Sequence, residues 1–148
     1  MKQQDKTIMM LIGDVHRQFG HQIRELEKKC GLGPCSGSIL MELSKNDSLT
    51  QVELVERIHM RPSSISVALQ KMEQDGLIER KIKDEDQRCS IVRITEKGIN
   101  IHDKMKQSIF AMDNNYTKKL SQKDLEKIRK ILIELSDILK KGDYNENI

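Results

Sequence analysis

Apolar residues recur at steps of three and four along the N-terminal segment, a spacing that places them on one stripe of an α-helix. The stripe consists of Ile8, Ile12, Val15, Phe19, Ile23 and Leu26. Gly31 predicts the end of this helix, because glycine readily adopts the left-handed backbone of a helix C-terminus. A second helix is expected to begin near Pro34, which suits the first helical position, and to run through Ile39, Leu40 and Leu43.

Two shorter helices are predicted next in the chain. Thr50 and Glu53 have the spacing of a capping box, in which each side chain binds the backbone amide of the other residue at a helix start. Pro62 opens the following helix and Gly76 ends it. The expected inward residues are Leu54, Val55 and Ile58 in the first of these helices and Ile65, Ala68, Leu69 and Met72 in the second.

Two β-prone runs come directly afterwards. Leu77 to Ile82 and Cys89 to Thr95 bracket six residues of which five are charged. The alternation within each run predicts a two-stranded ribbon with a charged tip. Such a ribbon has no core of its own and must pack on neighbouring helices. A helix followed by a charged ribbon is the order of a winged helix-turn-helix, in which the helix reads a major groove and the ribbon a minor groove.

The rest of the pattern predicts two more helices. Thr95 can cap one that runs to about Lys119, and Ser121 can cap the last. Their apolar positions are Ile101, Met105, Ile109 and Met112 in the first and Leu125, Ile128, Leu132, Leu135 and Leu139 in the second. Together with the first helix, these stripes exceed what a domain of about 70 residues could bury. This surplus favours an intertwined symmetric dimer built from both chain ends.

The predicted fold is therefore mainly α, a winged helix-turn-helix with a helical dimerisation region from both chain ends. We expect an N-terminal dimerisation helix in residues 1–32 and a DNA-binding region in residues 33–95. C-terminal dimerisation helices follow in residues 96–141, with a polar tail in residues 142–148.

The amino-acid composition argues against a membrane protein and against a secreted protein. Hydrophobic residues make up 36% and charged residues 33%, Trp is absent, and the net charge of +3 is mild, so the placement of basic residues matters more than their total. No apolar run approaches the roughly 20 residues that span a bilayer, and we expect no secretory signal. Three cysteines without an export signal fit a reducing cytosol. These features predict a cytoplasmic protein with no membrane partner.

Several short segments match a known family pattern. Asp86-Gln87-Arg88 precedes a strand that ends in Ile94-Thr95-Glu96-Lys97-Gly98. These two segments resemble the wing of the MarR family of bacterial transcriptional regulators, with one conservative change. Met72 to Ile78 resembles the end of its recognition helix, and Gly31 to Pro34 the join before its second helix. The resemblance covers Ile8 to Lys141.

The resemblance implies a homodimer that binds pseudo-palindromic operators and is often relieved by a small ligand, a metal or an oxidant. Two positions depart from the family, which often has a basic residue where Val67 stands and a polar one where Pro62 stands. The reading face of this chain therefore carries fewer charges.

A set of polar and basic residues is expected to contact DNA. Serine and glutamine side chains can bond base edges or phosphates, and Val67 can pack on a thymine methyl. Arg88 can enter a minor groove, with Asp86 orienting it, while basic residues beside the helix and on the ribbon bind phosphates. The expected set is Arg61, Pro62, Ser63, Ser64, Ser66, Val67, Gln70, Lys71, Arg80, Lys81, Asp86, Arg88 and Arg93. The alternative is an ordinary solvated helix face beside a cluster of surface charges.

Two cysteines are candidate redox residues. Cys30 and Cys35 flank a Gly-Leu-Gly-Pro turn. Cys35 is expected in the first turn of the second helix, where the aligned amides favour a thiolate. Cys30 could then resolve an oxidised Cys35 as a disulfide. The alternative, which is the commoner one, is that both are small apolar residues in the core; Cys89 is expected only to pack at the base of the wing.

Metal binding and catalysis have little support in the sequence. The four histidines form no i, i+4 pair with one another or with cysteine, so a metal site would need distant residues such as Cys30, Glu42 and His102. No nucleophile–base spacing, phosphate loop or paired carboxylates predict an enzyme, and no cofactor is expected. Methionine-rich helices could leave an apolar effector cavity between the dimer region and the reading head.

The sequence thus predicts a DNA-binding transcriptional regulator, a repressor in the first instance, that binds a pseudo-palindromic operator as a homodimer and is relieved by an effector. Two alternatives stay open. One is the same DNA binder controlled by cysteine oxidation or by metal, and the other is a winged helix that serves only as a protein-docking module.

Overall fold

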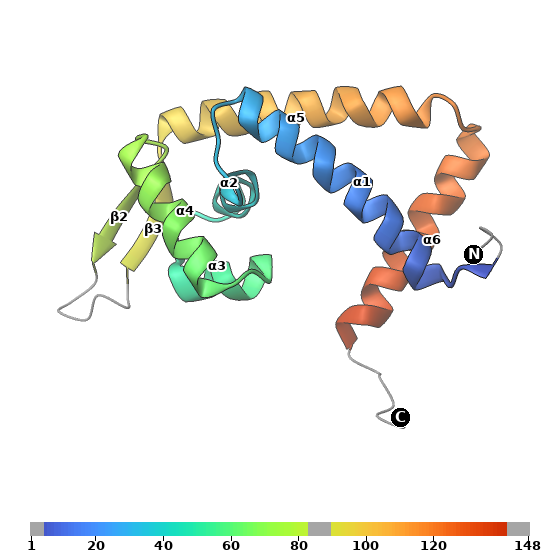
Figure 1. Cartoon of the computed structure of the whole chain (residues 1–148), viewed down its shortest axis with the longest axis horizontal. Coiled ribbons are helices and arrows are strands. Elements are labelled where there is room, and N and C mark those ends of the chain that lie inside the picture. The colour runs from blue at the N-terminus through green and yellow to red at the C-terminus, as the bar shows by residue number, and fades with distance from the viewer. Residues whose placement is uncertain (1–4, 83–89, 142–148) are drawn as a thin grey trace. The chain divides into compact units, whose positions relative to one another are not determined.

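A computed structural model describes residues 5–82 and 90–141 of the chain. Its elements divide between two compact units, Met1–Ile109 and Phe110–Ile148, which are considered separately. The fold class is mainly α, as predicted, with a small antiparallel sheet in the first unit. Figure 1 shows the course of the chain.

Helix α1 (Ile8–Lys29) has the expected bounds. The Thr7 hydroxyl accepts the Met10 N–H at 3.3 Å and caps the helix N-terminus. At the other end, Gly31 has a left-handed φ of 72° and the Leu32 N–H donates to the Glu27 carbonyl at 2.8 Å. This pattern is a Schellman motif, which satisfies the last helical carbonyls and turns the chain sharply.

Helix α2 (Ser36–Ser44) begins later than predicted. Pro34 is not its first residue, because Cys35 takes a left-handed φ of 70° and becomes the N-cap instead. A right-handed helix cannot include that backbone conformation, so helical geometry starts only at Ser36. The predicted position of Cys35 in the first helical turn is therefore wrong.

Helices α3 (Gln51–Ile58) and α4 (Pro62–Gln74) form as predicted. The capping box is complete: Thr50 N–H donates to Glu53 Oε2 at 2.7 Å, and Glu53 N–H donates to Thr50 Oγ1 at 3.2 Å. His59, with a φ of 55°, closes the tight connection between the two helices. On α4 the whole predicted inner face is buried, namely Ile65, Ala68, Leu69 and Met72.

The sheet contains the expected ribbon and one strand more. Strands β2 (Ile78–Ile82) and β3 (Ser90–Ile94) pair antiparallel, with Ile78 opposite Ile94 and Ile82 opposite Ser90. β1 (Leu49–Thr50) pairs with the other edge of β3, so the order is β1-β3-β2. A strand of two residues leaves no periodicity to detect, which is why the sequence did not predict β1.

Helix α5 (Glu96–Thr117) begins at the predicted cap, where the Gly98 N–H donates to Thr95 Oγ1 at 3.1 Å. Its first half contributes Met105 to a single core. That core joins α2, α3 and α4 to β1–β3, and these elements together are called the reading head below. The core consists of Leu32, Ile39, Leu40, Leu43, Leu49, Leu54, Ile65, Ala68, Leu69, Met72, Leu77, Ile78, Val92 and Met105. The packing leaves the outer side of α4 to solvent.

Helix α6 (Gln122–Lys141) belongs to the second unit. Ser121 caps it, because the Asp124 N–H donates to Ser121 Oγ at 3.1 Å. The structure describes every residue of this helix, and none of them is buried. Its exposed apolar residues include Ile128, Ile131, Leu132, Ile133, Ile138 and Leu139. A helix of this kind normally buries its apolar stripe against a partner.

Candidate nucleic-acid interface

The outer face of α4 is short, polar and nearly uncharged. Burial of Ile65, Leu69 and Met72 fixes the rotation of the helix, so the opposite side faces solvent. The predicted reading residues on that side are all exposed: Ser63, Ser66, Val67 and Gln70. Val67 is 69% exposed, which is unusual for a branched apolar side chain in the middle of a helix. The surface can therefore offer hydroxyl, amide and methyl groups to a ligand.

The N-terminus of α4 holds the next group of predicted residues. Arg61 is the N-cap and Pro62 the first helical residue; both are exposed, and Arg61 makes no side-chain cap bond. The Ser64 N–H donates to the Arg61 carbonyl at 3.0 Å. Ser64 is half-buried and lies at the edge of the outer face. The structure thus separates Ser64 from the fully exposed Ser63 and Ser66.

Two of the predicted phosphate contacts have partners within the chain. Lys71 Nζ lies 2.9 Å from Asp75 Oδ1, one helical turn away. Arg80 on β2 donates to Glu73 Oε2 of α4 through Nε, at 2.7 Å, and through Nη2. The exposed lysine pair is weak, about 0–1 kcal/mol, and phosphate can displace it. Arg80 is only 25% exposed and ties the ribbon to the helix.

The described part of the wing places its other basic residues outside. Lys81 on β2 and Arg93 on β3 are exposed, and Arg93 lies opposite Glu79 in the ribbon. The predicted minor-groove pair, Asp86 and Arg88, and the predicted packing residue Cys89 lie outside the described residues.

The base of the wing is fastened to the end of α4 by residues that the sequence did not single out for this role. Thr95 Oγ1 donates to the Gly76 carbonyl at 2.7 Å, and Lys97 Nζ donates to the Asp75 carbonyl at 2.7 Å. A Cβ atom on Gly98 would lie 2.2 Å from the Leu77 carbonyl oxygen. The reading helix, the ribbon and the start of α5 are therefore held as one body.

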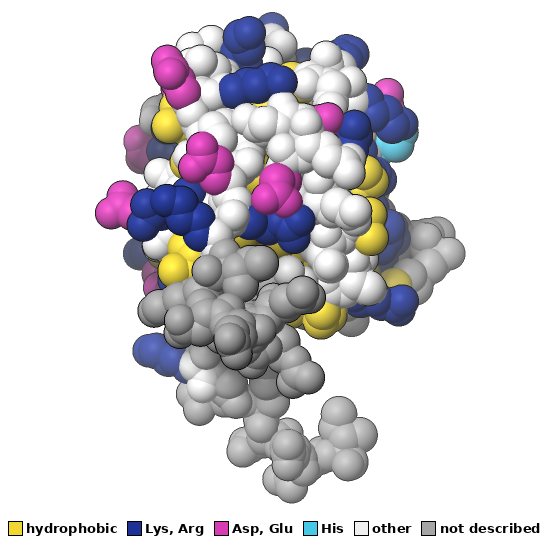
Figure 2. Space-filling view, turned by 90° about the vertical axis from the view of Figure 1, so that its left-hand side faces the viewer, with side chains coloured by type: hydrophobic (Ala, Val, Ile, Leu, Met, Phe, Trp, Pro, Cys, Tyr) yellow, Lys and Arg dark blue, Asp and Glu magenta, His cyan; other side chains and the backbone are white. Residues whose placement is uncertain are grey.

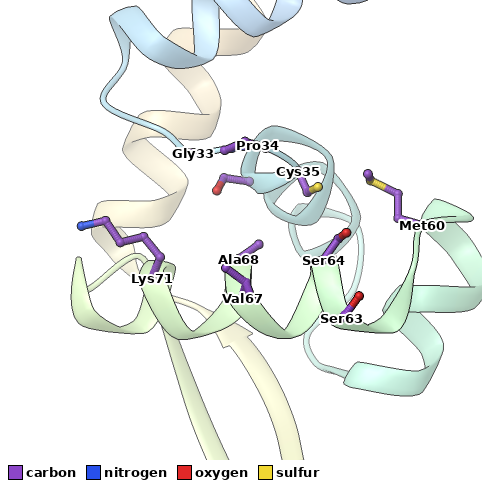
Figure 3. A pocket seen from close by; sticks show the side chains of 10 residues that line it. Gly33, Pro34, Cys35, Met60, Ser63, Ser64, Val67, Ala68 and Lys71 are labelled. Atoms are coloured by element: carbon purple, nitrogen blue, oxygen red, sulfur yellow. The ribbon is translucent and has the colours of Figure 1, made fainter.

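A cavity of about 490 Å³ lies between the start of α2 and α4. Figure 3 shows Gly33, Pro34 and Cys35 on one side, with Ser63, Ser64, Val67, Ala68 and Lys71 on the other and Met60 at one end. Its lining is mostly apolar. The sequence predicted an effector cavity between the dimer region and the reading head, whereas this one lies within the reading head beside the reading face.

Charges of both signs occupy the end of the molecule where the ribbon lies. Figure 2 views that side and shows Lys and Arg side chains interspersed with Asp and Glu, and the side chains that the structure describes there do not form one continuous basic patch. The pairs Lys71–Asp75 and Arg80–Glu73 follow the same pattern. The described side chains of this face therefore do not favour binding of an anionic partner through charge alone.

Cys35 does not have the electrostatic surroundings expected from the sequence. Burial and the nearby Glu27 carboxylate raise the pKa of its thiol. The expectation of a favoured thiolate is wrong, because Cys35 stands before the helix in a left-handed turn and faces an acid. Cys30 and Cys35 are both free and half-buried.

Neither a metal cluster nor a membrane span is found where the structure can be described. Residues 5–82 and 90–141 contain no group of three or more His, Cys, Asp and Glu side chains that could hold a metal ion. Within the same ranges, no helix is long and apolar enough to cross a membrane.

Comparison with known proteins gives a consistent result. A family model described as MarR family matches residues 34–90, from just before α2 to the first residue of β3. The organic hydroperoxide resistance transcriptional regulator of Bacillus subtilis is 27% identical over 143 residues, which cover 94% of this chain and 92% of that protein.

Solved structures share the fold. The transcriptional regulator BldR from Sulfolobus solfataricus superposes with a TM-score of 0.76 at 24% identity, covering 95% of this chain and 99% of that one. Wild-type MarR from E. coli, in its apo form, gives a TM-score of 0.77 at 18% identity and covers 88% and 97% of the two chains. Residues 34–90 thus match the MarR family model, and over nearly its whole length the chain is similar to a bacterial transcriptional regulator.

Proposed function

We propose that this regulator binds a pseudo-palindromic operator as a homodimer in the cytoplasm and represses transcription until an effector releases it. The observation that carries the proposal is the division of α4 into two faces. Its inner face is buried in the core, while its outer face offers Ser63, Ser66, Val67 and Gln70 to solvent. A folded reading head that leaves these groups unused has the chemistry of base-edge recognition.

The ribbon supports a second contact with the same duplex. β2 and β3 continue directly from the end of α4, and Lys81 and Arg93 on them are exposed. Arg80, which is paired with Glu73, orients the ribbon in this proposal rather than binding phosphate. Arg88 is proposed to enter the minor groove and Asp86 to orient it, as in the family that the chain resembles.

A dimer accounts for the apolar surface outside the reading head. α1 exposes Ile8, Met9, Val15 and Phe19, and α6 buries nothing within its own unit. Exposed apolar stripes on helices from both chain ends are what an intertwined interface requires. A dimer with two reading heads would match an operator with two half-sites.

Repression is proposed from the named functions of relatives. One relative, 26% identical over 91 residues, is the HTH-type transcriptional repressor MdtR of Bacillus subtilis. The effector is proposed to be a small molecule; control through Cys35 is disfavoured, because its raised pKa reduces the reactive thiolate.

The proposal is tested with operators selected by the full chain from a pool of random duplexes. If Val67 packs on a thymine methyl, replacing that thymine with uracil should weaken binding of the wild type but not of Val67→Ala. Val52→Ala is the matched control, because Val52 is also an exposed valine, at 57%, but on α3. It should keep the full sensitivity to uracil. Failure of the pool to yield any enriched sequence would favour the protein-docking alternative.

A further inference from the structure

Glu27 is a buried acid near the end of α1, with only 6% of its surface exposed. Its Oε1 atom accepts the backbone N–H of Gly37, the second residue of α2, at 3.0 Å. The N-cap of α2 is Cys35, whose side chain makes no cap bond. A carboxylate from another helix therefore does what an N-cap side chain ordinarily does, and it satisfies an amide that the helix leaves unpaired.

The contact depends on the absence of a side chain at residue 37. A Cβ atom on Gly37 would lie 2.6 Å from Glu27 Oε1 and 2.9 Å from the Met105 Cε atom of α5. Both distances are shorter than any ordinary contact. Three helices, α1, α2 and α5, thus come together at this glycine.

Glu27 also fixes the connection between the two helices through its backbone. Its carbonyl accepts the N–H groups of Cys30, at 3.0 Å, and of Leu32, at 2.8 Å. Leu32 is buried in the core of the reading head. One residue therefore holds the turn with its main chain and the helix beyond the turn with its side chain.

The surroundings of Glu27 make its charged form unfavourable. Burial raises the pKa of Glu27, while the Gly37 hydrogen bond and the charge of Arg24 oppose that rise. The Glu27 charge, together with burial, also raises the pKa of the Cys35 thiol. A buried carboxylate costs free energy, so simple packing would be served better by an apolar residue. The geometry instead uses its directional acceptor.

We propose that Glu27 is a positioning residue, which fixes the direction of the reading head relative to α1 and thereby sets the preferred spacing of the operator half-sites. The inference rests on the proposed function, because α1 carries apolar residues assigned above to the dimer and α2 carries core residues of the reading head. In a dimer, a change of angle between α1 and α2 moves each α4 relative to its copy. Half-site spacing is the measurable consequence of that separation.

The experiment uses the full chain and the operator that the wild type selects, with its two half-sites moved closer or apart by one base pair. The wild type should lose about tenfold or more in affinity at either altered spacing. Glu27→Ala should flatten this profile, so that the selected and altered spacings differ by only a few fold. Glu27→Gln should retain most of the profile, because its amide oxygen can accept the same N–H.

Two further variants make the result decisive. Glu25→Ala removes an exposed acid of the same helix that pairs with Lys28, and it should leave the profile unchanged. Gly37→Ala keeps the carboxylate but displaces it, so it should flatten the profile as well. It provides the test if Glu27→Ala does not fold. A Glu27→Ala or Gly37→Ala protein that binds every spacing proportionally more weakly, with unchanged ratios, would overturn the inference. Absence of any selected operator for the wild type would instead refute the proposed function itself.

Discussion

Two kinds of close contact constrain individual residues in this protein: glycines that allow two segments to approach closely, and ion pairs. Gly98 allows the start of α5 to approach the Leu77 carbonyl, and Gly37 allows Glu27 to reach α2. Arg80 is held by Glu73, while Val67 has no comparable constraint and faces solvent. Residues held by close contacts thus occur in the same unit as Val67, which is exposed and proposed to contact DNA.

Gly98→Ala should destabilise the fold strongly. The new Cβ would lie 2.2 Å from a backbone oxygen that cannot rotate away, so overpacking should cost about 1–3 kcal/mol of the free energy of unfolding. Gly33→Ala is the control, because the nearest atom to its Cβ, Ser36 Oγ, would be 4.0 Å away. Equal denaturation midpoints for the two variants in urea would contradict the close approach of α5 to the Leu77 carbonyl.

Glu27→Gln should change how stability depends on pH. Because the folded pKa of Glu27 is raised above its ordinary value of 4.5, its contribution to the free energy of unfolding is greatest below that value and is lost as pH rises through the raised pKa. The stability of the wild type relative to Glu27→Gln should therefore fall from pH 4.5 upward.

Glu25→Gln provides a control of opposite sign for that measurement. Lys28 lowers the pKa of Glu25, so its contribution is present above the ordinary value and is lost as pH falls through the lowered pKa. Chemical denaturation of the three proteins at several pH values gives both trends. A flat difference for Glu27→Gln would show that its carboxyl group is not desolvated.

The sensitivity of operator binding to oxidants depends on the Cys35 thiol. Because the pKa of the Cys35 thiol is raised, little of it is thiolate at neutral pH, and mild peroxide should leave operator binding unchanged. The same treatment of Cys35→Ser identifies any effect of other thiols. Loss of binding in the wild type alone would assign Cys35 a redox role.

Helices and strands could be predicted from the sequence where the residues that determine them lie close together in the chain. Caps at Thr50, Thr95 and Ser121 lie within three residues of their partners, and the buried face of α4 repeats every three or four residues. The outer face of α4 was predictable for the same reason, because it is the side of the helix opposite the buried residues.

Other elements could not be predicted because distant segments decide them. Cys35 takes its left-handed backbone at a junction that also involves α1, and β1 exists only because β3 pairs with it. The contact between Glu27 and Gly37 crosses ten positions, and Arg80 reaches Glu73 on another element. No periodicity within one segment contains such information.

Thr95→Ala should loosen the junction of α4, the ribbon and α5. The hydroxyl both donates to the Gly76 carbonyl and accepts the Gly98 N–H, and loss of a cap of this kind costs about 0.5–2 kcal/mol. Thr117→Ala is the matched control, because that hydroxyl bonds the Asp113 carbonyl one turn back in the same helix. It should change the free energy of unfolding by less than about 0.5 kcal/mol. Similar losses in both variants would remove the junction role of Thr95.

At the scale of the whole molecule, the apolar surface is the dominant feature. The second unit buries no residue of α6, and the first leaves much of α1 exposed. A chain of this composition stays soluble most simply when a second copy covers these stripes. Truncation after Leu120, which removes α6, should therefore give aggregated or unfolded protein, as judged by light scattering after gel filtration. A soluble, folded monomer would contradict the proposed dimer.

Two copies of α4 are proposed to contact the two half-sites of one duplex. The most direct measurement is the mass and sequence preference of the complex between the full chain and an operator selected from random duplexes. We predict two chains per duplex, and a double variant, Ser66→Ala with Gln70→Ala, that loses sequence preference but keeps salt-sensitive binding to any duplex. A complex with a single chain, or an unchanged sequence preference in the double variant, would contradict the account.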